Sequence, residues 1–263
     1  MQSNSEIRHP AIRGCLEYMK MEDGLEIHHD GDLPGRSGMG SSAAFTVGLI
    51  HCLHALKSEM VSKRALALEA MQVDQDIVGE TVGCQDHCAS AFGGLNRMDF
   101  SGERVDFTVT PIPLGKVGIK EFERYLMLFF TGISRHASEV AARQMARIGE
   151  NGAALERMAA MVTVGQELLI ARRFWDFGLL LEDAWQLKRS LGASNGKVDT
   201  IHDAAIRAGA LGAKILGAGE GGFMLVLAEP DRQMEIRAAL GDLLIVPFEF
   251  ETQGSQIVFY SEE

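Results

Sequence analysis

The sequence predicts an α+β protein of two domains, and three observations lead to that prediction. Apolar residues recur at helical spacing over 42–57 and 62–79, and again between 134 and 209. Short apolar runs typical of buried strands lie at 124–132, 213–228, 243–250 and 256–260, grouped rather than alternating regularly with helices. Two prolines and two glycines in TVTPIPLGKVG separate the two blocks. We therefore expect domains at 1–114 and 115–263.

Composition limits the class of function. The 263 residues are 46% hydrophobic, enough for one large core or two small ones. A formal net charge of −11 with scattered basic residues argues against a nucleic-acid or anionic-membrane surface, so the expected partner is a small molecule. No signal-peptide core and no run of eighteen apolar residues is present, and four cysteines are too few for a disulfide framework. These features predict a cytoplasmic protein.

The first block is predicted to contain two helices. Phe45, Leu49, Leu53 and Leu56 place one apolar face on a helix over 42–57. A second helix is expected to begin at Ser62 and to end at Gly79.

The second block begins with a predicted buried strand at 124–132. Helices are expected at about 134–150, 152–173, 176–191 and 198–209, and another at 231–240. Strand candidates follow at 213–228, 243–250 and 256–260, and the helix at 231–240 lies between the first two of them.

The stretch LPGRSGMGSSAAF, at 33–45, combines glycines and serines directly before the first helix. Glycines let backbone amides turn toward a ligand, and a helix N-terminus adds unpaired N–H groups and the positive dipole end. One of Ser41 and Ser42 could cap the helix while the other faces a phosphate or a magnesium ion. The stretch has neither the Gly-Lys-Ser/Thr of a Walker loop nor the G-x-G-x-x-G of a dinucleotide fold.

The stretch resembles the second signature of the GHMP small-molecule kinases, the family of galactokinase, homoserine kinase and mevalonate kinase. The matching residues, which the resemblance assigns to nucleotide binding, are Pro34, Gly35, Arg36, Ser37, Gly38, Met39, Gly40, Ser41, Ser42 and Ala43. A third family signature is matched by KILGAGEGGFMLVL at 214–227. Its Gly217, Ala218, Gly219, Glu220 and Gly221 are expected near substrate and phosphate, with Glu220 at a position where the family usually has glycine.

The resemblance implies the two-domain GHMP architecture, with a partial N-terminal domain and a ferredoxin-like α/β sandwich as C-terminal domain. It implies ATP and Mg²⁺ as cofactors. By register it places Asp74 with Ser42 on the metal and assigns Asp86 as the base that prepares the acceptor hydroxyl. Relatives commonly carry Glu at the metal position, so the shorter Asp74 would need a small helix shift or a bridging water.

Longer stretches, including VDQDIVGETVGCQDHCASAFGG, FFTGISRHASEVA and AWQLKRSL, resemble those family members that phosphorylate the anomeric hydroxyl of D-glycero-D-manno-heptose 7-phosphate. Arg36, Arg135 and Lys214 are the candidates to bind the phosphates, with Arg135 preferred because it follows a strand and begins a helix. Cys84, His87 and Cys88 could form a metal site, but ordinary buried thiols explain this spacing better.

Two alternatives remain open at the level of sequence. The chain could be a GHMP kinase for another sugar, of the fucose or galactose type. The family's N-terminal signature, R-x-P-x-R-x-x-x-G-G-G-T-D, does not occur in these residues, which fits a fragment, a misassigned start or a natural short form. The chain could then be a catalytically silent member that binds a ligand or forms a homo-oligomer through an uncovered sheet.

Overall fold

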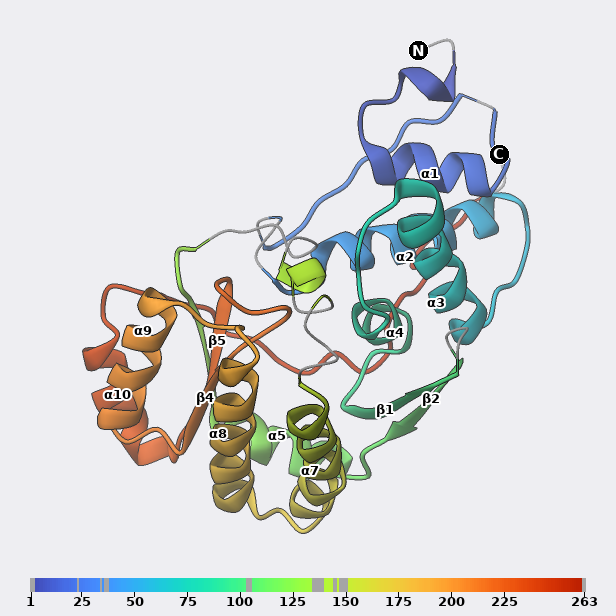
Figure 1. The fold of residues 1–263 in the computed structure, drawn as a ribbon. Helices are drawn as coiled ribbons and strands as arrows, with labels where there is room; N and C mark the ends of the chain where they lie inside the picture. The colour runs from blue at the N-terminus through green and yellow to red at the C-terminus, as the bar shows by residue number, and fades with distance from the viewer. Residues whose placement is uncertain are drawn as a thin grey trace.

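The computed structural model describes residues 3–22, 24–33, 35, 38–102, 106–133, 140–143, 146 and 151–261. Helices dominate its first part (Figure 1). The elements there are η1 (Asn4–Glu6), α1 (Pro10–Tyr18), α2 (Ser41–Leu56), α3 (Lys63–Gln72), the π-helical turn η2 (Val73–Val78) and α4 (Gln85–Phe92). The expected helices over 42–57 and 62–79 are confirmed, with the Ser62 hydroxyl accepting from the Ala65 amide at 3.1 Å and Gly79 ending η2.

These helices bury one apolar core. It is formed mainly by residues of α1, α2 and α3, among them Val47, Ile50, Leu53 and Leu66, which are at most 1% exposed. The hairpin of β1 (Asn96–Ser101) and β2 (Asp106–Pro111) adds Phe107 to the same core. Apolar burial of this kind is the main force that holds the helices together.

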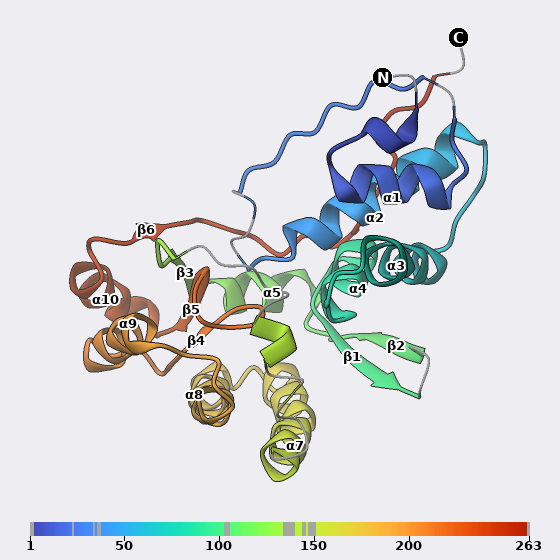
Figure 2. The same cartoon turned by 45° about the horizontal axis from the view of Figure 1, so that its top comes forward.

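The second part is built on a four-stranded antiparallel sheet. Its strand order is β4 (Gly212–Ile215), β5 (Phe223–Leu227), β3 (Leu126–Phe130) and β6 (Leu244–Ile245). The other elements are α5 (Gly115–Glu123), α7 (Gly152–Ile170), α8 (Phe174–Ser190), α9 (Gly196–Arg207), η4 (Pro230–Arg232) and α10 (Gln233–Ala239). Helices α8 and α9 pack on β4, and α7 lies beside α8 (Figure 2). The predicted α+β class is confirmed.

Glycines permit the closest of these contacts. A Cβ added to Gly212 in β4 would lie 2.2 Å from the carbonyl oxygen of Gly178 in α8. Helix and strand can therefore approach closely only because both positions are glycine.

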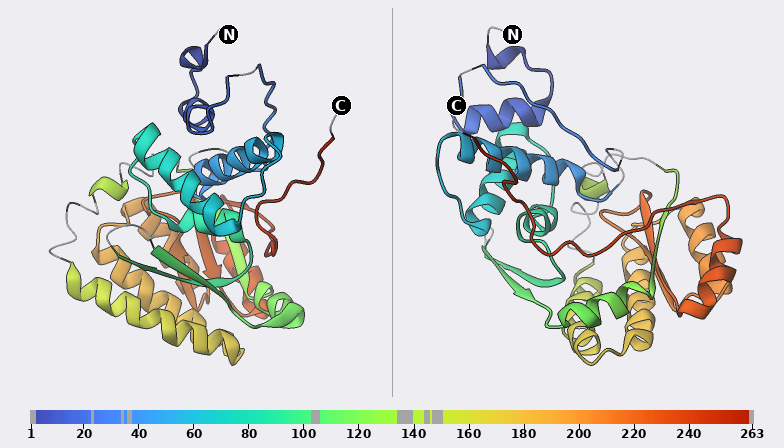
Figure 3. Two further views of the ribbon diagram at one scale, coloured as in Figure 1. Left: turned by 90° about the vertical axis from the view of Figure 1, so that its right-hand side faces the viewer. Right: turned by 180° about the vertical axis from the view of Figure 1, so that it is seen from behind.

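The end of the chain returns to the first group of helices, as the two views of Figure 3 show. The Gly94 amide donates to the Glu251 carbonyl at 2.6 Å, Lys63 Nζ donates to the Gln253 carbonyl at 2.5 Å, and His51 Nδ1 bonds the Ser255 hydroxyl at 2.9 Å. The two halves of the fold are thus joined by this segment as well as by the chain near residue 114. The domain limits 1–114 and 115–263 stay a prediction.

Several sequence expectations differ from the structure. Strand 243–250 is reduced to the two residues of β6, and 256–260 forms no strand; Val258 and Phe259 there are 92% and 82% exposed. The run 213–228 is two strands joined by the third signature. Helices α1, α4 and α5 and the hairpin β1–β2 were not anticipated, and most of 134–150 lies outside the described residues. Among the described helices, none is both long and apolar enough to cross a bilayer.

Candidate functional site

The glycine loop ends at the N-terminus of α2. Gly38 and Gly40 have φ of 81° and 69°, a region that residues with a Cβ enter only at a cost. Gly40 is the N-cap residue and no side chain caps this end, so the expectation that a serine hydroxyl caps the helix is wrong. The uncapped first-turn amides and the dipole end form a local anion-binding surface, beside which Ser41 is half-buried and Ser42 exposed. Pro34, Arg36 and Ser37 lie outside the described residues.

Asp86 lies against this loop. It occupies the first turn of α4, is half-buried, and approaches Gly40 so closely that a Cβ added there would lie 3.0 Å from the Asp86 Cβ and Cγ and 3.1 Å from Oδ2. The sequence places these residues far apart, and the packing of α4 on α2 brings them together. A carboxylate therefore stands beside the anion-binding amides.

The third signature reaches the same loop from the second part of the fold. A Cβ added to Gly217 (φ 63°) would lie 2.6 Å from the Gly38 carbonyl oxygen. Lys188, at the end of α8, donates through Nζ to the Gly217 carbonyl at 2.5 Å. The sequence reasoning missed Lys188 as a residue of this region, although the stretch AWQLKRSL contains it. Backbone from both halves thus meets at the glycine loop.

The rest of the third signature is shaped by two neighbouring turns. A Cβ at Gly219 would lie 2.4 Å from the Ala193 carbonyl oxygen, and one at Gly221 would lie 2.7 Å from Ile133 Cγ2. These contacts leave room for glycine only. Residues 219–221 of the third signature are therefore packed between Ala193, before α9, and Ile133, in the turn after β3. Arg135, which follows that turn in sequence, lies outside the described residues.

Glu220 adopts a backbone conformation that favours glycine, with φ of 62°. Its amide donates to the Ala193 carbonyl at 2.8 Å, and its own carbonyl accepts from Asn195 Nδ2 at 2.7 Å. Its carboxylate pairs with Arg143 at 2.6 Å. The unusual residue is thus accommodated by local hydrogen bonds and a partly exposed ion pair.

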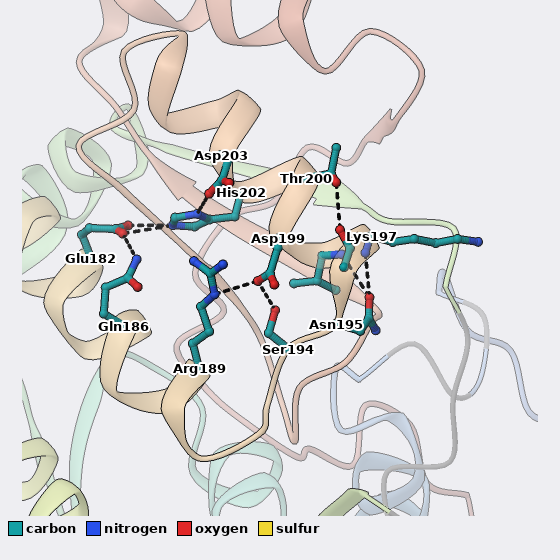
Figure 4. A network of polar contacts seen from close by, with 12 residues as sticks. Glu182, Gln186, Arg189, Ser194, Asn195, Lys197, Asp199, Thr200, His202 and Asp203 are labelled. Carbon is teal, nitrogen blue, oxygen red and sulfur yellow. Dashed lines mark hydrogen bonds and ion pairs between the residues drawn. The ribbon is translucent and has the colours of Figure 1, made fainter.

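A polar network on α8 and α9 supports this side of the site (Figure 4). Asn195 Oδ1 caps α9 by accepting from the amides of Lys197 and Val198, both at 3.1 Å. The Asp199 carboxylate accepts from Arg189 Nε at 2.8 Å and from the Ser194 hydroxyl at 2.6 Å. The turn that carries Asn195 is therefore fixed at both ends.

The same network contains a buried histidine. His202 is 3% exposed and bonds Glu182 at 2.9 Å and Asp203 at 3.0 Å. Burial alone would lower the pKa of His202, but the bonds to Glu182 and Asp203 outweigh it and raise the pKa above 6.5. Burial would raise the pKa of Glu182, yet the bonds it accepts, that from His202 foremost, bring it below 4.5. The ion pair of His202 with Glu182 therefore stabilises the fold most between pH 4.5 and 6.5, where Glu182 is ionised and His202 is protonated.

Asp74 has a different environment from the one that its predicted role requires. It is 1% exposed; Oδ1 accepts from the Thr46 hydroxyl at 2.9 Å, and Oδ2 bonds His87 Nε2 at 2.9 Å. Thr46 also lies 3.3 Å from the Ser42 carbonyl oxygen, so Asp74 sits behind the first turn of α2. With both oxygens engaged and buried, this carboxylate does not fit direct coordination of Mg²⁺ together with Ser42.

Among the residues that the structure describes, no group of three His, Cys, Asp or Glu side chains could hold a metal ion. His87 Nε2 is hydrogen-bonded to Asp74. Burial raises the pKa of Cys84 and raises that of Cys88 to about 12. Cys84 and Cys88 are therefore protonated thiols at neutral pH, in line with the simpler interpretation of their spacing.

Lys214 lies apart from the glycine loops. It lines a cavity formed by β1, α7, α8 and β4, and this lining includes no residue of the glycine loop and none of the residues 217–221. Burial lowers its pKa. The expectation that Lys214 binds a phosphate of the nucleotide or sugar is not supported by this position.

Two family models match the chain. The model described as GHMP kinases N terminal domain matches residues 9–94, and the one described as GHMP kinases C terminal matches 166–245. The first contains the glycine loop, Asp74 and Asp86, and the second contains the third signature.

Whole proteins are similar over most of the chain. A D-glycero-alpha-D-manno-heptose 7-phosphate kinase of Campylobacter jejuni is 29% identical over 230 residues, covering 85% of this chain and 67% of that protein. A mevalonate kinase of Pyrococcus abyssi is 31% identical over 246 residues, covering 90% and 68%. The crystal structure of a D-glycero-D-manno-heptose 1-phosphate kinase from Bacteroides thetaiotaomicron has a TM-score of 0.73 at 24% identity, covering 99% and 78%.

Proposed function

The chain belongs to the GHMP kinase family of ATP-dependent phosphotransferases, and we propose that it transfers the γ-phosphate of ATP to the anomeric hydroxyl of D-glycero-D-manno-heptose 7-phosphate. The observation that carries the proposal is the meeting of three segments. The glycine loop at 38–40 lies against the Asp86 carboxylate at Gly40 and against Gly217 of the third signature at Gly38.

The loop is the proposed phosphate cradle. Phosphoryl transfer needs mainly positioning and charge stabilisation of the transferred group. The uncapped amides of Ser41, Ser42 and Ala43 supply hydrogen-bond donors and the dipole end of α2. The close approach of Gly217 to the Gly38 carbonyl holds the loop in position. Side chains at Gly38, Gly40 or Gly217 would fill or distort this cradle, so the residue types suit a bound triphosphate.

Asp86 is the proposed base. A general base must lie within hydrogen-bond reach of the hydroxyl whose proton it accepts. Because Asp86 touches the loop at Gly40, an acceptor hydroxyl placed beside the γ-phosphate would be within its reach. The carboxylate would orient this hydroxyl and take its proton as the phosphorus–oxygen bond forms, and ADP would leave.

Magnesium is proposed to accompany ATP, where it would neutralise phosphate charge. Ser42 remains the proposed protein contact, since it is exposed at the first turn of α2. Asp74 is better suited to hold α2, η2 and α4 together, so we assign no step of the reaction to an ion held by Asp74.

The acceptor is proposed from the similarity to the Campylobacter jejuni heptose kinase. The mevalonate kinase of Pyrococcus abyssi is similar to the chain to about the same degree, so the acceptor must be chosen by experiment. We propose the cytoplasm as the location, because the substrates are phosphorylated metabolites and the thiols are free.

The test is ADP release with a panel of acceptors: heptose 7-phosphate, fucose, galactose and mevalonate. We expect heptose 7-phosphate to give the highest kcat/KM, and ³¹P NMR to detect a phosphate on the anomeric carbon. Asp86→Asn should lower kcat by about 10²–10⁴-fold while ATP binding measured by calorimetry is retained. Asp76→Asn, an exposed carboxylate on η2, is the matched control and should leave kcat unchanged.

Three outcomes would overturn parts of this proposal. Preference for another acceptor would retain the kinase and replace the substrate. Binding of an ATP analogue without turnover of any acceptor would favour a silent ligand-binding member. An Asp86→Asn variant with full kcat would remove Asp86 from the reaction.

A further inference from the structure

We propose that the cavity between β1, α7, α8 and β4 binds a small amphipathic carboxylate, with its acid group at Lys214 and its carbon chain among the apolar side chains. The cavity has a volume of about 350 Å³. Pockets that bind small molecules have volumes of roughly 300–1,000 Å³ and are mostly apolar with few polar groups. This cavity meets both conditions.

The lining is apolar over most of its extent. Its side chains include Ile112, Met158, Met161, Leu169, Phe177 and Leu181. Since a water molecule occupies about 30 Å³ in the liquid, the volume corresponds to roughly ten groups of that size. A saturated chain of that length, such as the one in decanoate, therefore suits the space.

Lys214 is the cationic group in this lining that lacks a partner in the described part of the chain. No hydrogen bond or ion pair joins its side-chain Nζ to another described residue, and burial lowers the pKa of this amine. The other cation of the lining, Arg97, is already neutralised, because its guanidinium bonds both oxygens of Asp99 at 2.9 Å and also bonds Gln166 at 3.0 Å. An anion entering the cavity would therefore pair with Lys214.

The charge favours a monoanion. A desolvated ammonium is costly unless it is paired, and one carboxylate compensates it fully. A phosphate dianion would leave one charge uncompensated in an apolar lining. A neutral chain would fill the space and leave the ammonium unpaired.

The cavity is separate from the kinase site. Its lining contains neither the glycine loop, nor Asp86, nor Gly217. Failure of this proposal would thus leave the proposed phosphate transfer untouched, and the reverse also holds.

The experiment is calorimetric titration of the full chain with decanoate and with decanol at pH 7.5. We expect decanoate to bind at one site per chain and decanol to bind more weakly. Lys214→Met should weaken decanoate binding about 10- to 100-fold, the usual contribution of a hydrogen bond to a charged group, and leave decanol binding unchanged or stronger. Lys116→Met, an exposed lysine of α5, is the matched control and should bind decanoate like the wild type.

A second variant tests the cavity independently of charge. Ala184→Phe should fill the space that Ala184 lines and abolish binding of both probes. Retention of the circular dichroism spectrum and of a cooperative thermal unfolding transition would show that each variant is folded. Equal decanoate affinity in the wild type and Lys214→Met would overturn the proposal, as would the absence of saturable decanoate binding to the wild type.

Discussion

The contact between Gly40 and Asp86 gives a direct test of the site, because a single methyl group placed there acts on both the loop and the carboxylate. In Gly40→Ala the new Cβ would lie 3.0 Å from Asp86 Cβ and Cγ, whereas ordinary contact begins at 3.4 Å. Asp86 must therefore move about 0.4 Å. Alanine at φ 69° also costs about 1–2 kcal/mol of folding free energy.

The displacement of Asp86 and the backbone cost of alanine at position 40 both have measurable consequences. A displacement of about 1 Å in a reacting group can lower a rate roughly 10²-fold, so a shift of about 0.4 Å should lower kcat about five- to tenfold. The backbone cost should lower Tm by about 2–8 °C. Coupled ADP release gives kcat, and thermal unfolding followed by circular dichroism gives Tm.

Gly48→Ala supplies the control within the same helix. Gly48 lies inside α2, and apart from its chain neighbours and the backbone of its own helix, no atom of the described residues lies within 4 Å of an added Cβ. Alanine should stabilise the helix there by about 0.5–1 kcal/mol and leave kcat unchanged. If Gly40→Ala kept kcat within twofold of the wild type while Gly48→Ala behaved as expected, the assignment of Asp86 to the phosphate loop would be refuted.

Three further predictions concern groups around the site. Asp74→Asn should lower the free energy of unfolding in urea by about 1–3 kcal/mol, because one of the two buried donors, Thr46 or His87, loses its acceptor. The control Asp76→Asn, at an exposed position, should change this free energy by no more than about 0.5 kcal/mol. Equal effects of the two substitutions would contradict the argument. Glu220→Gly should lower KM for ATP without loss of stability, since it relieves a positive φ and removes a negative charge near the cradle; a higher KM would show that the carboxylate assists binding. His202→Gln should reduce the free energy of unfolding most between pH 4.5 and 6.5. Its difference from the wild type should shrink as pH rises through the raised pKa of His202 or falls through the lowered pKa of Glu182, and parallel pH curves would contradict this.

The helices on which the site is built were predictable because their signals are local. Ser62 caps α3 and Gly79 ends η2, and both residues act on their own chain neighbours. The glycines at 38, 40 and 217 indicated turns for the same reason. The family resemblance placed both signatures near the phosphates, but the contact of Gly217 with Gly38 was not predicted, because no spacing rule links two turns so distant in sequence.

What could not be predicted depends on tertiary contacts. The engagement of Asp74 by Thr46 and His87 requires α2, η2 and α4 to be packed, and no periodicity reveals it. The segment 256–260 is an apolar run typical of a strand, yet a strand forms only where a neighbouring strand pairs with it, and none of the described residues does so here. Lys214 is the first residue of the third signature and lies in β4, where the alternation of side chains along the strand places it toward the α7–α8 cavity instead of the glycine loop.

The arrangement of the site implies that phosphate binding depends on how the two halves of the fold are held. Gly38 belongs to the first half and Gly217 to the second, and they approach so closely that neither loop can keep its position if the halves separate. Lys188 fixes Gly217 to α8, while the segment at 251–255 returns to Gly94 and α2. A change in these supports would therefore alter the cradle without touching a ligand. Because Asp86 contacts the same loop at Gly40, a loop that has lost the support of Gly217 would also change its position relative to Asp86, so binding of ATP and the rate of transfer should change together.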